Sequence, residues 1–130
     1  MTTATTTTIQ LPAATIELRP GERYSGAVLD QDGNVKHHLI LLSDRPAARV
    51  CWQDAMAWAE SVDGQLPDRQ EQALLFANCK PHLQKTWHWS SETNEEDASS
   101  AWNCGFGYGD QYGFRKSYEG SAVAVRRLIP

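Results

Sequence analysis

The cysteines and histidines of this chain allow two kinds of chemistry. Cys79 and His82 have the short spacing common in zinc sites, and His88 and Cys104 would complete a set of four ligands. No second pair matches the first, so the spacing is only a weak indication of zinc. Alternatively, Cys104 would act as a nucleophile with His88 or His82 as its base, which requires a stabilised thiolate that nothing in the spacing provides. We therefore expect no catalytic residue, no metal ligand and no cofactor.

The region from residue 87 to residue 118 is rich in aromatic side chains, which lie among glycines, serines and acids. Aromatic rings give large and stiff contact area, and small polar residues give adaptable hydrogen bonding, a mixture favoured in recognition loops. Core filling is the alternative for each ring. We expect Trp89 and Trp102 to be mostly buried. The side chains expected to be exposed and to bind a ligand are His88, Asn103, Tyr108, Asp110, Gln111, Tyr112, Arg115 and Tyr118.

Length and charge place limits on the class of protein. The chain has 130 residues, which suits one domain, and we expect a flexible threonine-rich arm over 1–10 and a single domain over 11–130. The net charge of −4 argues against binding to a nucleic-acid backbone. No segment has the pattern of a signal peptide or a membrane span, so no membrane partner is expected. The odd number of cysteines predicts free buried thiols.

Strands dominate the expected N-terminal part. Residues 15–18 alternate between polar and apolar types and predict a short strand. Two β-prone runs, 24–29 and 35–42, flank the segment 30–34, whose Asp-Gly and Asn residues can take the positive φ angles of a hairpin turn. A hairpin is therefore predicted here.

Two helices are expected in the middle of the chain. Apolar residues recur at three- and four-residue spacings over 50–62, which predicts an amphipathic helix. A second helix is predicted to begin after Pro67, because Asp68 and Glu71 have the spacing of a capping box, and to run toward Cys79.

The last third of the sequence returns to the period of strands. Trp102, Cys104, Phe106 and Tyr108 would share one face of such a strand. Strands followed by helices and then by strands predict the α+β class with an antiparallel sheet. The expected elements are strands at 87–91, 101–108, 114–118 and 121–128, an acidic loop at 92–100 and a turn at 109–113.

Four motifs, taken in order, resemble a known family. They are GQLPDR at 64–69, WHWSSE at 87–92, SAWNCGF at 100–106 and VAVRRL at 123–128. They resemble the domain-of-unknown-function family typified by the C-terminal domain of bacterial collagen-like adhesins, which is similar in fold to C-type lectins and to the formylglycine-generating sulfatase modifiers. The hairpin with HHLILL at 37–42 further resembles a subgroup of small stand-alone proteins of bacteriophage and prophage genomes.

The resemblance implies a compact C-type-lectin-like domain, with two helices and a mainly antiparallel sheet preceded by an N-terminal hairpin. Its loops between the late strands would display the contact residues. Calcium-dependent lectins of this fold use a Trp-Asn-Asp tripeptide, whereas this sequence has Trp102-Asn103-Cys104. Because sulfur replaces a hard oxygen ligand, we do not expect calcium-mediated sugar binding.

Two non-enzymatic functions are compatible with the sequence. The first is a non-enzymatic recognition module, a phage or prophage structural or adhesion accessory that binds a protein or glycan and is associated with the virion. The second is an intracellular phage accessory protein that binds and modulates a host protein, and a cysteine- or metal-dependent enzyme is the least favoured. Both would be made in the host cytoplasm. Edge strands and the threonine-rich arm also favour pairing with a second copy of the chain.

Overall fold

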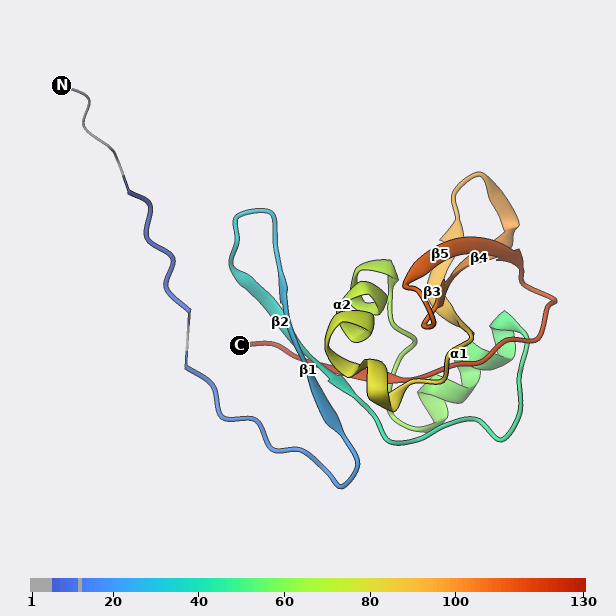
Figure 1. The fold of residues 1–130 in the computed structure, drawn as a ribbon, viewed down its shortest axis with the longest axis horizontal. Helices are drawn as coiled ribbons and strands as arrows, with labels where there is room; N and C mark the ends of the chain where they lie inside the picture. The colour runs from blue at the N-terminus through green and yellow to red at the C-terminus, as the bar shows by residue number, and fades with distance from the viewer. Residues whose placement is uncertain (1–5, 12) are drawn as a thin grey trace.

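The computed structural model describes residues 6–11 and 13–130, and it has the α+β architecture expected from the sequence (Figure 1). Two helices accompany two three-stranded antiparallel sheets, whereas one sheet was expected. The predicted arm at 1–10 lies partly outside the described residues, and residues 6–10 are exposed and form neither helix nor strand. The elements in chain order are β1 (Arg23–Leu29), β2 (Val35–Leu41), α1 (Trp52–Ser61), α2 (Arg69–Cys79), the short 3₁₀ helix η1 (Lys80–His82), β3 (Trp87–Asn94), β4 (Asp97–Gly105), β5 (Asp110–Arg115) and β6 (Val125–Leu128).

The first sheet has the strand order β1-β2-β6, and the predicted hairpin forms two of its strands. The hairpin turn is closed by the carboxylate of Asp30, which accepts hydrogen bonds from the backbone N–H groups of Asp32 and Asn34 at 2.9 and 3.0 Å. Such side-chain caps are the reason why aspartate favours turns. β6 pairs with the other side of β2, so the beginning and the end of the domain share one sheet.

The second sheet is a meander with the order β3-β4-β5. The predicted acidic loop at 92–100 is wrong, because β3 continues to Asn94 and β4 already begins at Asp97. Asn94 accepts a hydrogen bond from the Glu96 backbone at 2.9 Å, and Asp97 accepts one from the Ser99 backbone at 3.0 Å. These two side chains hold a tight turn in place of a loop.

The predicted limits of the later strands also need correction. β4 ends at Gly105, where the Gly109 backbone N–H bonds the Gly105 carbonyl at 2.7 Å and Gly109 adopts a φ of +79°. This closes the turn four residues earlier than expected, so Tyr108 no longer shares a strand face with Cys104, and residues 110–113 of the predicted turn belong to β5. The last strand is confined to β6, and the strand predicted at 15–18 is absent: those residues are mostly exposed and unpaired.

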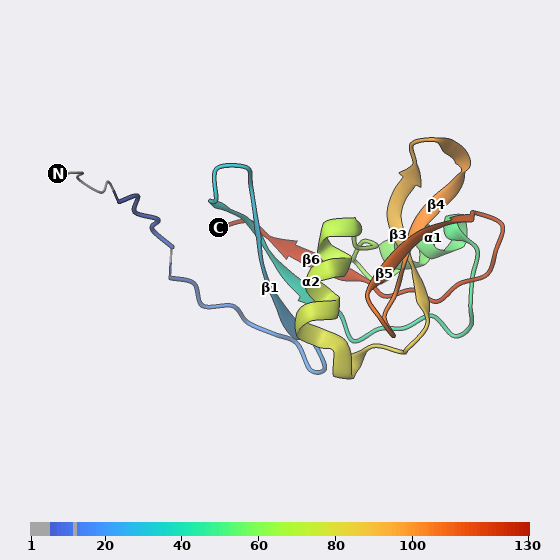
Figure 2. The ribbon, with the colours of Figure 1, turned by 45° about the horizontal axis from the view of Figure 1, so that its top comes forward.

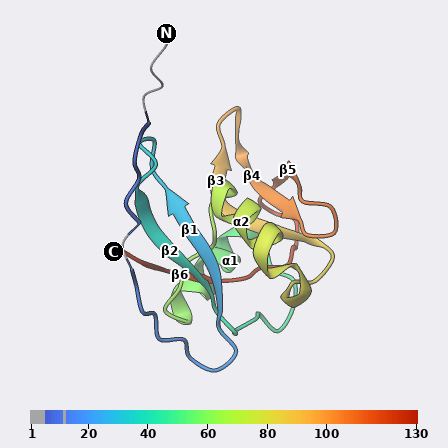
Figure 3. The same ribbon diagram turned by 60° about the vertical axis from the view of Figure 1, so that its left-hand side comes forward.

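Helix α2 lies between the two sheets (Figures 2 and 3). Its buried residues Leu75 and Cys79 join a core cluster with Leu39 of β2 and Phe106 of the turn after β4. Helix α1 packs on the other face of the meander, where a second cluster forms around the buried ring of Trp89. No helix within the described residues is long and apolar enough to cross a membrane.

Candidate functional site

An open groove of about 860 Å³ lies between the first turn of α2 and the meander. The helix begins here because the predicted capping box forms: Asp68 accepts the Glu71 backbone N–H at 2.7 Å, and Glu71 accepts the Asp68 backbone N–H at 3.0 Å. The capping box therefore fixes the backbone from which the next side chains project. The groove is lined by Asp68, Arg69, Gln70, Ala73, Glu92, Gly109 and Gln111.

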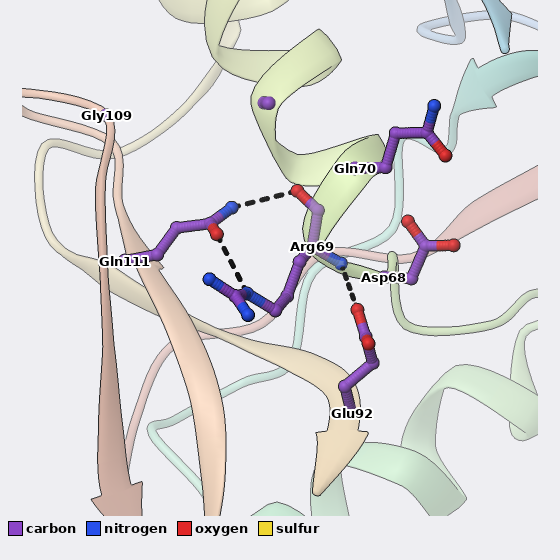
Figure 4. A pocket seen from close by; sticks show the side chains of 7 residues that line it. Asp68, Arg69, Gln70, Glu92, Gly109 and Gln111 are labelled. Atoms are coloured by element: carbon purple, nitrogen blue, oxygen red, sulfur yellow. Dashed lines mark hydrogen bonds between the residues drawn. The ribbon is translucent and has the colours of Figure 1, made fainter. Parts of the chain in front are cut away.

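Arg69, the first residue of α2, is held in place from several sides. Its guanidinium carbon lies 3.6 Å from the ring centroid of Trp102, and its Nε donates to the Gln111 amide oxygen at 3.0 Å. The Gln111 amide returns a bond to the Arg69 carbonyl at 2.8 Å, and the Arg69 backbone N–H donates to the Glu92 carboxylate at 2.7 Å. Figure 4 shows Arg69 extending toward Gln111, whereas Asp68 and Gln70 extend away from it. The stack on Trp102 and the Nε bond orient the guanidinium, and the two backbone bonds hold the residue that carries it.

The electrostatics of the groove are mixed. Burial raises the pKa of the Asp68 carboxyl against the opposing effect of its bond from the Glu71 backbone. Glu92 and Gln70 are exposed, so the groove offers acceptors as well as the cationic fork of Arg69. Carboxylates, amides and a guanidinium together suit a polar ligand that both donates and accepts hydrogen bonds.

Behind the groove, Glu71 anchors α2 to the first sheet. Its carboxylate is fully buried and accepts bonds from Nε and Nη2 of Arg127 at 2.7 and 2.6 Å. The ring of His37, also buried, lies 2.8 Å from the same carboxylate. Burial alone would raise the pKa of Glu71, but the bonds from Arg127, the Asp68 backbone and His37 outweigh burial and lower that pKa. The first turn of α2, which forms one side of the groove, is therefore bonded through Glu71 to β2 and β6.

Six of the eight side chains expected to be exposed are at least partly accessible. Tyr108, Tyr112 and Tyr118 are 91, 52 and 51 % exposed, which agrees with the prediction. Arg115 is exposed, and Asp110 and Gln111 are half-buried.

The expected exposure of His88 and Asn103 is wrong, because they are only 2 and 0 % exposed. The register of β3 and β4 places His88 opposite Cys104 and Asn103 opposite Trp89, so both polar side chains point into the interior. Trp102, expected to be mostly buried, is half-buried under Arg69.

The structure divides the accessible residues between two faces of the meander. Gln111 faces the groove, whereas Tyr112 stacks at 6.5 Å on Phe114 of the same strand, and Phe114 lies 6.0 Å from Tyr118. Successive side chains of a strand point to opposite faces, which explains the separation. The Tyr112 hydroxyl also donates to the Asp110 carboxylate at 2.6 Å. We call Tyr112, Phe114 and Tyr118 the aromatic row.

Arg69 and Glu92, two main features of the groove, were not among the residues predicted for the site. Arg69 sits in a capping sequence that indicates only a helix start, and its partners are 23, 33 and 42 positions away in the chain. Only the packing of α2 against the meander brings them together, so no short-range signal pointed to them.

The meander also brings together the two residues of the nucleophile hypothesis. His88 and Cys104 lie opposite each other in β3 and β4. Burial lowers the pKa of His88 to about 4, with Arg45 contributing, and burial together with Asp110 raises the pKa of Cys104 to about 11. Both shifts favour the neutral forms at pH 7, so this environment opposes an imidazolium-thiolate pair. Among the residues that the structure describes, no group of three or more His, Cys, Asp or Glu side chains is arranged to hold a metal ion.

Thiol labelling should therefore discriminate between the three free cysteines. We expect iodoacetamide to modify the half-buried Cys51 of the folded protein at pH 8, and to leave the buried Cys79 and Cys104 unmodified. A pKa raised from 9.0 to about 11 lowers the thiolate fraction of Cys104 by about 100-fold, in addition to the steric protection. Mass spectrometry of peptides after timed labelling measures this, and labelling in guanidinium chloride is the control. Fast, pH-dependent modification of Cys104 in the folded state would contradict the expectation.

Comparison with known proteins identified no family for the chain. No family model matches the sequence, and no curated protein matches it either. The family suggested by the four motifs therefore stays a prediction.

Proposed function

We propose that the protein is a non-enzymatic recognition module that binds a glycan in the groove beside α2. The observation that carries this proposal is the orientation of the Arg69 guanidinium, which stacks on Trp102 and donates from Nε to Gln111, while Gln111 and Glu92 hold the Arg69 backbone. Its Nη1 and Nη2 atoms form no hydrogen bond within the described part of the chain, so they are free to donate to a ligand. A side chain that is already ordered loses little entropy on binding.

The other groups of the groove also suit a glycan. Sugar hydroxyls both donate and accept, and the groove offers the carboxylates of Asp68 and Glu92 and the amides of Gln70 and Gln111. Tyr108 directly precedes Gly109, which lines the groove, and its ring is 91 % exposed. An exposed ring with a polar tip adds contact area at low entropic cost.

A C-type-lectin-like fold and a role as a phage or prophage structural or adhesion accessory are part of the same proposal. The α+β architecture with two helices and the four sequence motifs support it. Under this proposal the ligand is bound without calcium, because the position after Asn103 is the buried Cys104.

Arg69→Lys tests the groove. Lysine keeps the charge but loses the planar fork and the stack on Trp102, so we expect glycan affinity to fall by about 10- to 100-fold. Wild-type protein is first applied to an array of immobilised glycans, and the dissociation constants of its hits are then measured for both proteins. Arg23→Lys, an exposed position on β1 of the other sheet, is the matched control. An array with no hit, or equal affinity of Arg69→Lys and wild type, would overturn the proposal.

A second candidate function is the binding of a protein partner through the aromatic row. The observation that favours it is the exposure of about half of Tyr112 and Tyr118 beside Phe114 on β5, an edge strand of the meander. Exposed aromatic rings are enriched where protein interfaces have their strongest contacts. The partner would be a virion protein for a structural accessory, or a host protein for an intracellular modulator. Detection in purified particles, as opposed to infected cytoplasm alone, separates these two roles.

The tyrosines should be dispensable for folding if they are contact residues. We expect the Tyr108→Ala, Tyr112→Ala and Tyr118→Ala triple variant to lose less than about 1 kcal/mol of unfolding free energy, because the rings are at least half exposed. The same variant should no longer retain the protein partner in an affinity purification that succeeds with wild type. A loss of several kcal/mol in chemical denaturation would assign the rings to the core instead.

A further inference from the structure

A second cavity, of about 310 Å³, lies where the loop between β2 and α1 passes the start of β3. Its polar lining comes from three separate segments, and proline and alanine side chains at 46–48 and at 122 form the apolar part of the wall. It shares no lining residue with the groove beside α2. The polar lining residues are Arg45, Arg49, Gln84, Thr86, His88 and Ser121.

The cavity carries positive charge in a protein whose net charge is −4. Arg45 is fixed by bonds from its Nη1 to the carbonyl oxygens of Leu42 and Asp44 at 2.6 and 2.7 Å. Arg49 is exposed and forms no side-chain hydrogen bond or ion pair with the residues that the structure describes. The nearest acid along the chain is Asp44, which does not line the cavity; no lining residue is acidic. Asp44 acts electrostatically on Arg45 from outside the cavity, but neither guanidinium forms an ion pair with a carboxylate among the described residues, which favours an oxyanion as ligand.

His88 gives the cavity one hydrogen-bond acceptor. Its Nδ1 lies 3.0 Å from the Thr86 carbonyl oxygen, which can only accept, so Nδ1 carries the hydrogen and Nε2 carries the lone pair. The ring is 98 % buried, packs 4.7 Å from Phe106, and has no partner for Nε2 in the described part of the chain. Burial lowers the pKa of His88 to about 4, which keeps the ring neutral at pH 7.

We propose that this cavity binds a small hydroxylated organic acid, whose carboxylate pairs with Arg45 and Arg49 and whose hydroxyl donates to His88 Nε2. The volume is at the lower end of the range for ligand pockets, which suits a small molecule. The alanine and proline wall accommodates a short carbon skeleton.

Lactate and propionate form a matched pair of probes, because they differ only by the hydroxyl group. We expect isothermal titration calorimetry at pH 7 and constant ionic strength to show saturable binding of lactate, about tenfold tighter than propionate because propionate lacks the hydroxyl that donates to His88 Nε2. Arg49→Gln should weaken lactate binding by about tenfold or more. Because Arg49 makes no side-chain bond in the described structure, thermal unfolding of Arg49→Gln should match wild type.

Lys36→Gln is the control for net charge, since Lys36 is an exposed residue of β2 that does not line the cavity. It should bind lactate like wild type. Three results would overturn the proposal: no saturable lactate binding up to about 50 mM, equal lactate affinity in Arg49→Gln, or binding of inorganic phosphate alone. The groove proposal fails or holds separately, because Arg69→Lys does not touch this cavity.

Discussion

Glu71→Ala is expected to lower the free energy of unfolding by about 3–5 kcal/mol, which is a large part of the stability of a domain of this size. The fully buried carboxylate holds Arg127 through two bonds, lies 2.8 Å from His37 and completes the capping box with Asp68. Alanine removes every bond of the carboxylate, keeps only the backbone N–H bond to Asp68, and leaves a guanidinium and an imidazole facing a void. Urea denaturation followed by circular dichroism measures the loss.

The matched control is Glu60→Ala, an exposed glutamate on α1, which should change stability by no more than about 0.5 kcal/mol. The pH dependence gives a second measurement. The pKa of Glu71 is lowered in the folded protein, so its contribution to stability is complete above its unfolded value of 4.5 and is lost as the pH falls through the folded pKa. Glu71→Ala should therefore lose less stability than wild type on acidification below pH 4.5. If the free energy of unfolding falls equally with pH in both proteins, the Glu71 carboxylate does not make the stabilising contribution assigned to it.

Gly120→Ala is expected to cost about 3 kcal/mol, near the upper end of the range for overpacking. A Cβ atom at this position would collide with the six-membered ring of Trp87, whose Cε3 it would meet at 2.9 Å. The glycine backbone is pinned by reciprocal bonds with Val50 at 2.8 and 2.9 Å, and the Trp87 ring is packed edge-on against Trp89 and Phe114. Neither the Gly120 backbone nor the Trp87 ring can move away without breaking these bonds or contacts. The midpoint of thermal unfolding gives the measurement.

Gly107→Ala is the control for the loss of a glycine, because the nearest atom to its added Cβ is 4.0 Å away. It should leave the midpoint almost unchanged. The double variant Gly120→Ala with Trp87→Leu should recover part of the loss attributed to the collision, since leucine vacates the space of the ring. If Gly120→Ala alone unfolds at the wild-type midpoint, the proposed close packing of Trp87 on Gly120 is incorrect.

Local chemistry explains which parts of the fold were predictable from the sequence. The hairpin was predicted because residues 30–34 are turn formers between two β-prone runs, and in the structure Asp30 caps this turn. Helix α2 was predicted because Asp68 and Glu71 have the spacing of a capping box, and they exchange two bonds within one helical turn. The contacts that determine these elements lie only a few residues apart, so the sequence displays them directly. The two helices, the hairpin and the α+β class follow from such signals.

The positions that were predicted wrongly or not at all depend on contacts between residues far apart in the chain. His88 and Asn103 are polar, and their burial depends on which residues of β3 and β4 face each other, a choice altered by irregularities between Trp89 and Thr93. Arg69 meets Gln111 only after α2 has packed on the meander. A one-residue change of register moves a side chain to the opposite face, so spacing alone did not assign these positions.

The strand order of the first sheet has a consequence for how the chain folds. The meander pairs neighbours in sequence, whereas β6 must find β2 across the whole domain, with His38 opposite Leu128. Contacts between distant residues form slowly, because a long loop must close before they contribute. Glu71 gains Arg127 only in that step. We therefore expect the amide protons of the first turn of α2 to acquire protection from hydrogen exchange late in refolding, together with those of β6 and after those of the meander.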